Sequence, residues 1–574
     1  MIQKDPTKVL ILGNEPRVAL RDESPQRTVV LYGSPTLNGE PVTEIGALGK
    51  LGEKSQNPTN LVKSLNGEFV LLIETPDQLV LANDRFAALP IFYAIDTASL
   101  VVSFSYQQIW RWLSQNSRLK IDSLAFYEFL HFQRLFGTTT FDQTSNVLTP
   151  ATVLTIDKRS KNPSTARYWK PNFDKRHDGR NAIASDLADA IKNTVALKTN
   201  DAAHTTLLLS GGMDSRAALG GFTPDALPNC VTIGASENNE VDVAKAVSAT
   251  AGAPHTFVQR PATHYADILP QAVADGGGMY TFHHGHFYGL DIPDTDLILH
   301  GHGFDYFFQG MYLPSKRRSL VGQPTRTWAL EPIGFDLTGE YIAKAKYRLK
   351  GIDTVDLLDA NVANDATGRL RADLDSVLKN INGETSEPYD DWDYLTTSAP
   401  GRHYTYLNLL SAASLAEQRT IAFDNDILDI YYSIPAKMRH GTRLLAETIK
   451  ILNPKLLEVR NANTNLRPDL SPTRLTIDSW MRGAKRRVGI GRIATSDPSD
   501  KDRSWPSEDG VLRNSPALQE RLTDLRKSQN LDSLNIFDTA KINQLIDSFE
   551  AGNNSPATAL LTLITIDEFI RSSS

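Results

Sequence analysis

The 574-residue sequence contains a single cysteine, no long apolar run and no large excess of charge of either sign. One cysteine, Cys230, excludes a disulfide framework and a thiolate metal cluster. No stretch approaches the roughly 20 apolar residues that a membrane-spanning helix needs, and the first residues lack the apolar core of a signal peptide. We therefore expect a cytoplasmic protein without a membrane partner.

The balance of charges also argues against nucleic acid as a partner. The sequence has 60 Lys and Arg residues against 67 Asp and Glu residues, a net charge of −7. Nucleic-acid binding usually needs a concentrated basic face, so we expect no nucleic-acid partner. At roughly 150 residues per domain, the length predicts more than one domain.

The hydrophobic pattern changes along the chain. Short β segments separated by turns fill residues 1–160, which predicts a β-rich layered domain. The polar residues 161–180 predict a linker. In residues 181–574 strands alternate with helical segments and a helical part follows, which predicts an α/β domain whose parallel sheet is covered on both faces. The polar residues 313–400 within it predict an insertion or lid.

The strongest chemical signal lies where a strand is followed by a glycine-rich turn and a helix. The strand-forming residues Thr-Thr-Leu-Leu-Leu at 205–209 precede the sequence Ser-Gly-Gly-Met-Asp-Ser. Glycines let an anion approach bare backbone amides, and hydroxyls add donors, whereas Asp214 repels phosphate unless a magnesium ion lies between them. The residues that we assign to nucleotide binding are Ser210, Gly211, Gly212, Asp214 and Ser215. A plain turn with Asp214 as a helix cap is the alternative, and the pattern lacks the Gly-Lys-Ser/Thr ending of a Walker loop.

This turn resembles the loop that grips pyrophosphate in the ATP-pyrophosphatase (PP-loop) enzymes. Two further segments narrow the resemblance to the asparagine synthetase family: Leu-His-Gly-His-Gly-Phe-Asp-Tyr at residues 299–306 and Glu-Gln-Arg-Thr-Ile-Ala-Phe-Asp at residues 417–424. The resemblance implies a PP-loop synthetase domain over residues 181–574 that binds ATP and Mg²⁺. It also implies that Asp214 and Asp305 hold the metal.

Residues 1–160 resemble the glutaminase half of the same family, which has an Ntn-hydrolase-like fold. The resemblance rests on the motifs Leu-Asn-Gly-Glu-Phe and Ala-Asn-Asp-Arg-Phe. It implies an oxyanion pocket at Asn66 and Gly67 and a site for the glutamine amine at Asp84. The family nucleophile is an N-terminal cysteine, whereas this sequence begins Met-Ile. We therefore expect a vestigial, inactive glutaminase, as in the β-lactam synthetases and lasso peptide cyclases that this chain resembles.

Two departures from the family lie in the synthetase segment. Where the family has a glutamate that helps to deprotonate the amine, this sequence has His302. Imidazole has an ordinary pKa of about 6.5 and is a credible general base near neutral pH, although a hydrogen bond to backbone or phosphate is an equal alternative. The family lysine that steadies the adenylate aligns with Thr442, and the adjacent Arg443 either replaces it or is an ordinary exposed charge.

The resemblance thus implies a ligase that adenylates a carboxylate with ATP, releases pyrophosphate and joins the acyl group to an amine or ammonia. The carboxylate belongs to a small molecule, a sugar or a peptide, and a homodimer is compatible with the sequence. Two alternatives stay open: a catalytically degenerate scaffold and a PP-loop enzyme that modifies RNA. For the histidine cluster at residues 283–286, lining of the acceptor pocket is favoured over a metal site.

Overall fold

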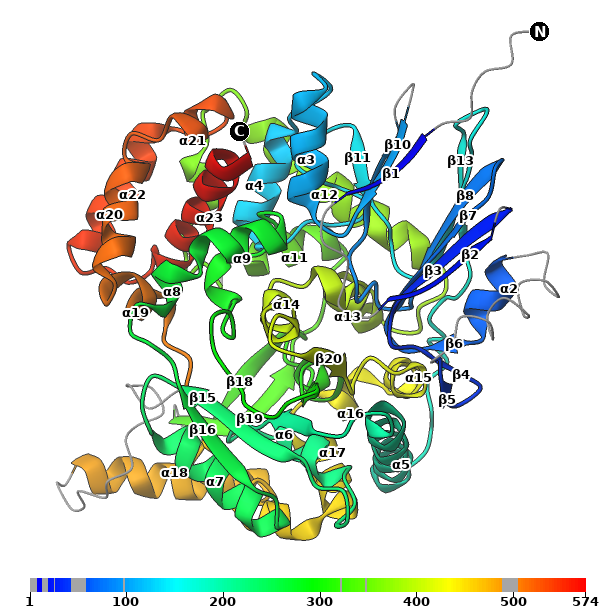
Figure 1. The fold of residues 1–574 in the computed structure, drawn as a ribbon. Coiled ribbons are helices and arrows are strands. Elements are labelled where there is room, and N and C mark those ends of the chain that lie inside the picture. Colours follow the sequence, from blue (N-terminus) through cyan, green and yellow to red (C-terminus); the bar gives the residue numbers. More distant parts are fainter. Residues whose placement is uncertain are drawn as a thin grey trace, which may run out of the picture.

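We describe a computed structural model over residues 8–12, 19–24, 26–42, 58–95, 99–320, 323–345, 348–487 and 504–573. The Met-Ile pair at the start, on which the expected loss of glutaminase activity depends, lies outside these residues. Residues up to 167 form a β-rich part, and the following residues build a second part on a parallel sheet (Figure 1). No helix within the described residues is long and apolar enough to cross a membrane.

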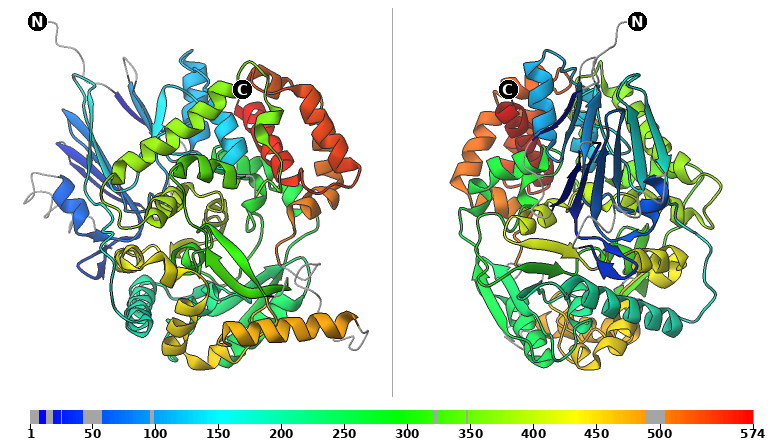
Figure 2. Two further views of the ribbon diagram at one scale, coloured as in Figure 1. Left: turned by 180° about the vertical axis from the view of Figure 1, so that it is seen from behind. Right: turned by 45° about the vertical axis from the view of Figure 1, so that its right-hand side comes forward.

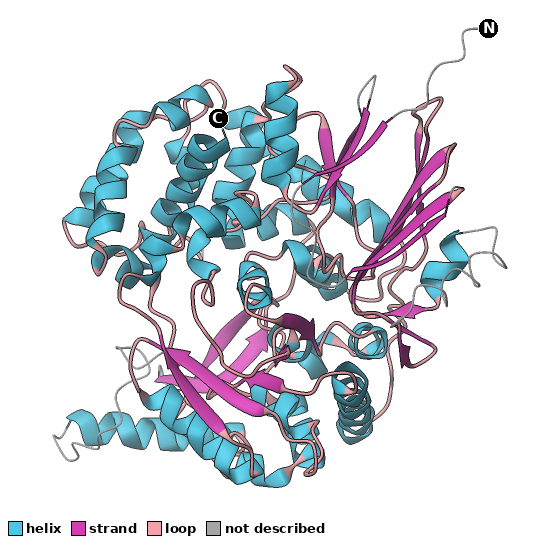
Figure 3. Cartoon of the chain, viewed as in Figure 1, coloured by secondary structure: helices cyan, strands magenta, loops and turns pink. Residues whose placement is uncertain are grey.

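Two sheets form the centre of the N-terminal part (Figure 3). Their strands are β1 (Lys8–Leu12), β2 (Ala19–Ser24), β3 (Arg27–Gly33), β7 (Phe69–Glu74), β8 (Gln78–Asn83), β9 (Phe92–Ile95), β10 (Ser99–Ser103), β11 (Ser145–Val147), β12 (Thr152–Asp157) and β13 (Pro163–Arg167). One sheet has the order β13-β12-β8-β7-β3-β2 and the other β1-β10-β9-β11. A small sheet is formed by β4 (Thr36–Leu37), β5 (Glu40–Pro41) and β6 (Leu65–Asn66).

Alternating apolar side chains bury both faces of the six-stranded sheet. In β3, Val30 and Tyr32 pack with residues of the four-stranded sheet, whereas Val29 and Leu31 pack with Leu61 of α2 (Pro58–Lys63). This is the period-2 pattern of a strand covered on both sides. The β-rich layered arrangement expected for this part is therefore present.

Helices close the other face of the four-stranded sheet. They are α3 (Tyr106–Gln115) and α4 (Ser123–Phe132), and both contact α23 (Ala557–Ser573) at the end of the described chain. The Trp110 ring meets that of Phe569 with the centroids 5.2 Å apart. Figures 1 and 2 show α3 and α4 between the strands of the N-terminal part and the C-terminal helices. The two ends of the sequence thus share one hydrophobic core.

The second part contains the expected parallel sheet. Its strands are β14 (Thr205–Leu208), β15 (Asn229–Gly234), β16 (His255–Gln259), β17 (Leu297–His300) and β20 (Glu417–Thr420). They follow the order β16-β15-β14-β17-β20 and all pairs are parallel. The chain moves from β14 outward to β16 and then returns to the other side of β14, so the strand order reverses between β14 and β17. Ligands of open α/β sheets bind at the carboxyl ends of the strands beside such a reversal.

The remaining elements cover this sheet and fill the space between the two parts. The helices are α5 (Arg180–Thr199), α6 (Asp214–Gly220), α7 (Asn239–Ala251), α8 (His264–Asp267), α9 (Leu269–Gly276), α10 (Phe304–Phe308), α11 (Leu337–Ala345), α12 (Ala363–Leu378), α13 (Pro388–Thr397), α14 (Leu407–Ala413), α15 (Asn425–Ser433), α16 (Ala436–Arg439), α17 (Arg443–Leu452), α18 (Pro472–Arg487), α19 (Glu508–Arg513), α20 (Pro516–Leu525), α21 (Gln529–Ser533) and α22 (Thr539–Glu550). Short 3₁₀ helices are η1 (Phe282–His284), η2 (Thr354–Leu357), η3 (Lys379–Ile381), η4 (Pro400–Arg402) and η5 (Pro454–Leu457). Helix α7 contacts β15 and β16, α6 contacts β14, and α14 contacts β20.

The structure bears on two expectations about organisation. Strand β13 lies within the predicted linker at residues 161–180 and pairs with β12; its exposed, polar edge position explains why it shows no apolar signal. Residues 313–400 are regular in structure, while their expected role as an insertion or lid stays a prediction. They form the hairpin of β18 (Ser315–Leu320) and β19 (Gln323–Leu330) and the helices α11 to α13, of which α12 packs on α4 through residues such as Leu370 and Leu374. Their polar average composition hid this helical spacing of apolar residues.

Candidate functional site

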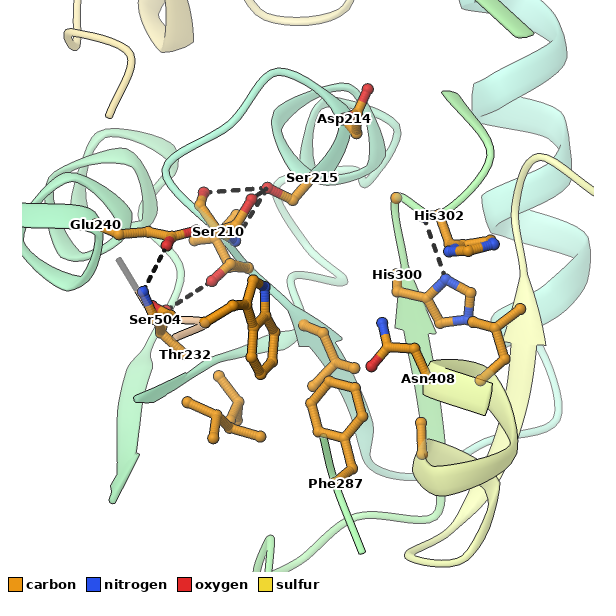
Figure 4. Close-up of a pocket in the computed structure, with 18 of the residues that line it drawn as sticks. Ser210, Asp214, Ser215, Thr232, Glu240, Phe287, His300, His302, Asn408 and Ser504 are labelled. Atoms are coloured by element: carbon orange, nitrogen blue, oxygen red, sulfur yellow. Dashed lines mark hydrogen bonds between the residues drawn. The ribbon is translucent and has the colours of Figure 1, made fainter. Parts of the chain in front are cut away.

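A cavity of about 190 Å³ lies at the carboxyl ends of β14, β15 and β17, where the strand order reverses (Figure 4). The polar side chains that line it are Ser210, Asp214, Ser215, Thr232, Glu240, His300, His302, Asp305, Asn408 and Ser504. Its main apolar side chains are Val231, Ile233, Phe287, Leu409, Ala412 and Trp505. Five of the residues assigned from the sequence, Ser210, Asp214, Ser215, His302 and Asp305, therefore meet at one cavity.

The turn after β14 is held by its own hydroxyl groups. The Ser215 Oγ accepts a hydrogen bond from the Ser210 amide at 3.0 Å and donates to the Ser210 carbonyl at 3.1 Å (Figure 4). The Ser210 Oγ accepts from the Gly212 amide at 3.2 Å. A Cβ on Gly211 would lie 2.3 Å from the Cβ of Ala462, so only glycine fits there. The serines predicted to bind phosphate thus first of all shape the turn.

Asp214 and Asp305 lie close enough to oppose each other's charge. Asp214 begins α6 and Asp305 lies in α10, just after β17. The approach requires a glycine, because a Cβ on Gly301 would lie 2.4 Å from the carbonyl carbon of Asp214. Burial raises the pKa of both carboxyls, that of Asp305 to about 6, and the charge of Asp305 raises the pKa of Asp214 further. The Gln309 Nε2 donates to the Asp214 Oδ1 at 2.6 Å.

Such a pair of carboxylates suits a divalent cation. Mg²⁺ is usually bound by one or two carboxylates together with water and substrate phosphates rather than by a cage of protein ligands. Within the described ranges, no group of three or more His, Cys, Asp or Glu side chains is placed to hold a metal. Asp214 and Asp305 therefore fit a metal that shares its other ligands with a substrate, and the side chain of Asp214 points away from the two serines (Figure 4).

His302 lies beside this pair but differs from the titrating base expected from the sequence. Burial lowers the pKa of His302 to about 4, so its ring is neutral at pH 7. Its buried Nε2 has no hydrogen-bond partner among the described residues. The backbone amide of His302 donates to the Nδ1 of His300 at 3.3 Å. His302 thus offers the Nε2 of a neutral ring to a ligand, and its role as a base stays a prediction.

Arg443 does not line this cavity. It is exposed at the first turn of α17, where it lines a neighbouring cavity of about 610 Å³ together with Thr442. Gln309 connects lining residues of the two cavities, because its side chain donates to Asp214 while its carbonyl accepts from the Gly441 amide at 2.9 Å. The expected replacement of the family lysine by Arg443 therefore stays a prediction.

Comparisons with known proteins assign the central part of the chain. Residues 186–445 match the family model "Asparagine synthase". The match covers less than half of the 574 residues, and the chain is similar to the asparagine synthase family over this domain. It is 26% identical over 214 residues to asparagine synthetase [glutamine-hydrolyzing] 1 of Bacillus subtilis (strain 168), a match that covers 36% of this chain and 33% of that protein. The chain thus matches about a third of the length of this curated relative.

Two solved structures are similar over part of the chain. One is glutamine phosphoribosylpyrophosphate amidotransferase from B. subtilis complexed with ADP and GMP, at 10% identity and a TM-score of 0.18, covering 49% of this chain and 57% of that one. The other is described as the allosteric regulatory enzyme of purine biosynthesis, at 11% identity and a TM-score of 0.18, covering 49% and 56%. TM-scores this low carry no argument about the fold.

The predicted glutaminase residues lie outside the asparagine synthase domain and are occupied by other contacts. The buried carboxyl of Asp84 accepts hydrogen bonds from three backbone amides, at distances of 3.0, 2.7 and 3.2 Å, and burial raises its pKa to about 7. The Asn66 Nδ2 donates to the carboxylate of Asp424 at 3.0 Å, and its Oδ1 accepts from the amide of Asn425 at 2.7 Å. Gly67 has a φ of +97°, which favours glycine. The side chains of Asp84 and Asn66 are therefore both engaged by protein groups of the described residues.

The segment at residues 417–424 also has a structural task that its sequence does not reveal. The Glu68 Oε2 accepts from the Thr420 amide at 2.8 Å and from the Lys198 Nζ at 3.2 Å, and both Glu68 and Lys198 are buried. Phe423 stacks on Phe86 with the ring centroids 5.0 Å apart. This segment of the asparagine synthase domain is therefore the seam between the two parts of the chain.

Sequence reasoning missed the residues at the far end of the cavity. Asn408 comes from α14, and Ser504 and Trp505 precede α19, beyond the matched residues 186–445. The histidine cluster does not line this cavity, although His286 stacks on Trp505 with the ring centroids 4.0 Å apart. No motif marks these positions, because only the fold brings them to the sheet edge.

Proposed function

We propose that the chain is an ATP-dependent ligase that forms C–N bonds, activating a carboxylate as its adenylate and joining it to an amine or to ammonia. One observation supports this most: the Ser-Gly-Gly-Met-Asp-Ser turn after β14 and Asp305 after β17 meet at one cavity beside the reversal of strand order. The match of residues 186–445 to the asparagine synthase family points to the same reaction class.

The size and lining of the cavity suggest how ATP binds. Pockets that enclose a drug-sized ligand measure roughly 300–1,000 Å³, so a cavity of about 190 Å³ encloses only part of a nucleotide. We place the base and ribose in the apolar end and the phosphates along the turn at residues 210–215. A magnesium ion held by Asp214 and Asp305 would neutralise the negative charge of the bound phosphates and of the pyrophosphate when it leaves.

The reaction then needs two displacements. An oxygen of the substrate carboxylate attacks the α-phosphorus, and the bond to the pyrophosphate oxygen breaks. The amine nitrogen attacks the acyl carbon and AMP leaves with the electrons of the C–O bond. The proton lost by the amine passes to the unpartnered Nε2 of the neutral His302. Positioning of the reactants and neutralisation of phosphate charge account for most of the rate in such sites.

The amine source in this proposal is ammonia or an amino group of the second substrate. The only cysteine in the sequence, Cys230, is buried in β15, and burial raises the pKa of its thiol to about 11. A thiol needs its thiolate form to attack an amide. Together with the occupied Asn66 and Asp84, this supports an N-terminal part without glutaminase activity. The carboxylate substrate is a small molecule, a sugar or a peptide.

A catalytically degenerate scaffold is the second candidate, and the exposed position of Arg443 outside the nucleotide cavity favours it. The two are separated by binding of Mg·ATP to the full chain in calorimetry, which a ligase shows and a scaffold lacks. We then expect carboxylate-dependent release of pyrophosphate for one member of a panel of small acids, uronates and peptides.

The variant Asp214→Asn tests the site itself. It should lower pyrophosphate release by at least about 100-fold, because it removes a carboxylate that would hold the magnesium ion against the phosphates. The matched control is Asp225→Asn, since Asp225 is exposed in the loop between α6 and β15 and should not affect the rate. Full activity of Asp214→Asn with the active substrate would remove the proposed mechanism.

A further inference from the structure

We infer that Asn408 recognises the 6-amino group of the nucleotide's adenine and that Trp505 forms the wall that encloses this base. The inference rests on the proposed function and assigns the base specificity of the same site. It follows from three features of the cavity: the separation of its polar and apolar ends, an unpaired carboxamide, and an aromatic segment from the C-terminal part of the chain.

The two ends of the cavity differ in chemistry. The phosphate end carries the turn at residues 210–215, whereas Val231, Ile233 and Phe287 line the other end. Figure 4 shows Phe287 and Asn408 on the opposite side of the cavity from Ser215. A purine has apolar faces and a polar edge, so it fits the apolar end provided that a polar group there meets its edge.

Asn408 is that polar group. Its backbone is fixed at the start of α14, because its amide donates to the Thr405 carbonyl at 3.1 Å and its carbonyl accepts from the Ser411 Oγ at 2.8 Å. Its buried Oδ1 has no hydrogen-bond partner within the described residues. An unpaired buried polar atom destabilises a fold, and a ligand that pairs with it recovers that loss. Adenine presents an amino donor beside a ring-nitrogen acceptor, and the carboxamide of Asn pairs with this edge.

Trp505 closes the same end. Its ring stacks on His286 at 4.0 Å between centroids with an interplanar angle of 23°, and the guanidinium of Arg260 lies over it at 5.3 Å. Two hydrogen bonds fix the backbone of the preceding residue, Ser504. Its amide donates to the Glu240 Oε2 at 3.0 Å, and its carbonyl accepts from the Arg260 Nη2 at 2.6 Å. The indole is therefore a fixed wall of the cavity, contributed from outside the matched residues 186–445.

The test compares Mg·ATP with the Mg²⁺ complex of purine riboside triphosphate, which lacks the 6-amino group, by calorimetry on the full chain. The unmodified chain should bind ATP about 10-fold more tightly. Asn408→Ala should bring the two affinities to within about two-fold of each other by weakening ATP alone. Asn408→Asp keeps an acceptor for the amino group and should retain the preference. The matched control is Asn543→Ala in α22, which also removes a buried Oδ1 without a partner but lies outside the cavity.

Trp505→Ala should weaken the binding of both nucleotides about 10-fold, because an aromatic wall contacts the purine ring of either nucleotide. Trp480→Ala in α18, the control, should weaken the binding of neither.

The inference is overturned if the unmodified chain binds both nucleotides equally while Asp214→Asn still abolishes pyrophosphate release; the proposed function then stands. It is also overturned if Asn408→Ala, folded by circular dichroism, keeps the 10-fold preference. An unmodified chain that binds neither nucleotide refutes both the inference and the proposed function.

Discussion

Replacing Gly301 by alanine should displace Asp214 and lower the activity of the site, although it changes no side chain to which we assign a chemical role. The added Cβ would lie 2.4 Å from the Asp214 carbonyl carbon and 2.6 Å from both the Asp214 oxygen and the Ser215 nitrogen. These are rigid backbone atoms, so β17 and the start of α6 must separate by about 1 Å to reach ordinary contact. A misplacement of about 1 Å lowers a reaction rate on the order of 100-fold, and overpacking of this kind costs about 1–3 kcal/mol of the free energy of unfolding.

The assay has three readouts: Mg·ATP binding by calorimetry, pyrophosphate release with the active carboxylate, and denaturant unfolding. Gly301→Ala should weaken the first, lower the second by about 100-fold and destabilise the chain. The matched control is Gly368→Ala, since a Cβ at this position in α12 meets nothing within 4 Å. That variant should leave binding unchanged and stabilise the helix by up to about 1 kcal/mol. If Gly301→Ala binds and releases pyrophosphate as the unmodified chain does, the claimed closeness of β17 and α6 is wrong.

Three further predictions concern stability. Asp84→Ala leaves three backbone amides without their hydrogen-bond acceptor and should lower the free energy of unfolding by about 1–3 kcal/mol in denaturant titrations. ATP affinity in calorimetry should stay the same, and a loss of ATP affinity would contradict a purely structural role. Lys198→Met leaves the buried Glu68 without its ion-pair partner and should lower the free energy of unfolding by about 3–5 kcal/mol. The double variant with Glu68→Gln should recover part of this loss, and a Lys198→Met chain as stable as the unmodified chain would refute the buried pair. Burial lowers the pKa of His264 to about 4 from its ordinary 6.5, so between these pH values the unfolded chain binds more protons than the folded chain. The free energy of unfolding should therefore be about 3 kcal/mol higher at pH 7, and this difference should be lost as the pH falls from 6.5 to 4. Scanning calorimetry across this range measures the loss, and an unchanged pH slope of the melting temperature in His264→Gln would contradict the assignment.

The parallel sheet and the strand–turn–helix geometry at residues 205–215 were predictable because their signals are local. Strand-forming runs such as residues 205–209 end at glycines or polar residues, and the strands found there need no information from distant parts of the sequence. The pairing of Asp214 with Asp305 was predictable as well, since both follow strands of one parallel sheet. By contrast, the polar composition around α12 concealed an apolar stripe with Leu370 and Leu374.

Other properties depend on tertiary burial and could not be found in the sequence. His302 has an ordinary imidazole until the surrounding protein lowers its pKa to about 4. Asn408 and Trp505 lie far from the turn in sequence and reach the cavity through α14 and the approach to α19. Asn66 matches a family motif, yet in the structure its amide binds Asp424 and Asn425. A motif identifies a residue type at a position, whereas its partners are set by the fold.

The seam at Glu68, Lys198 and Thr420 ties the N-terminal part to the parallel sheet through a buried carboxylate. Truncation at this border would remove the carboxylate partner of Lys198 and of the Thr420 amide, and it would take from Phe423 its aromatic neighbour Phe86. Substitutions in the N-terminal part are therefore constrained at this contact face, whatever chemistry that part performs.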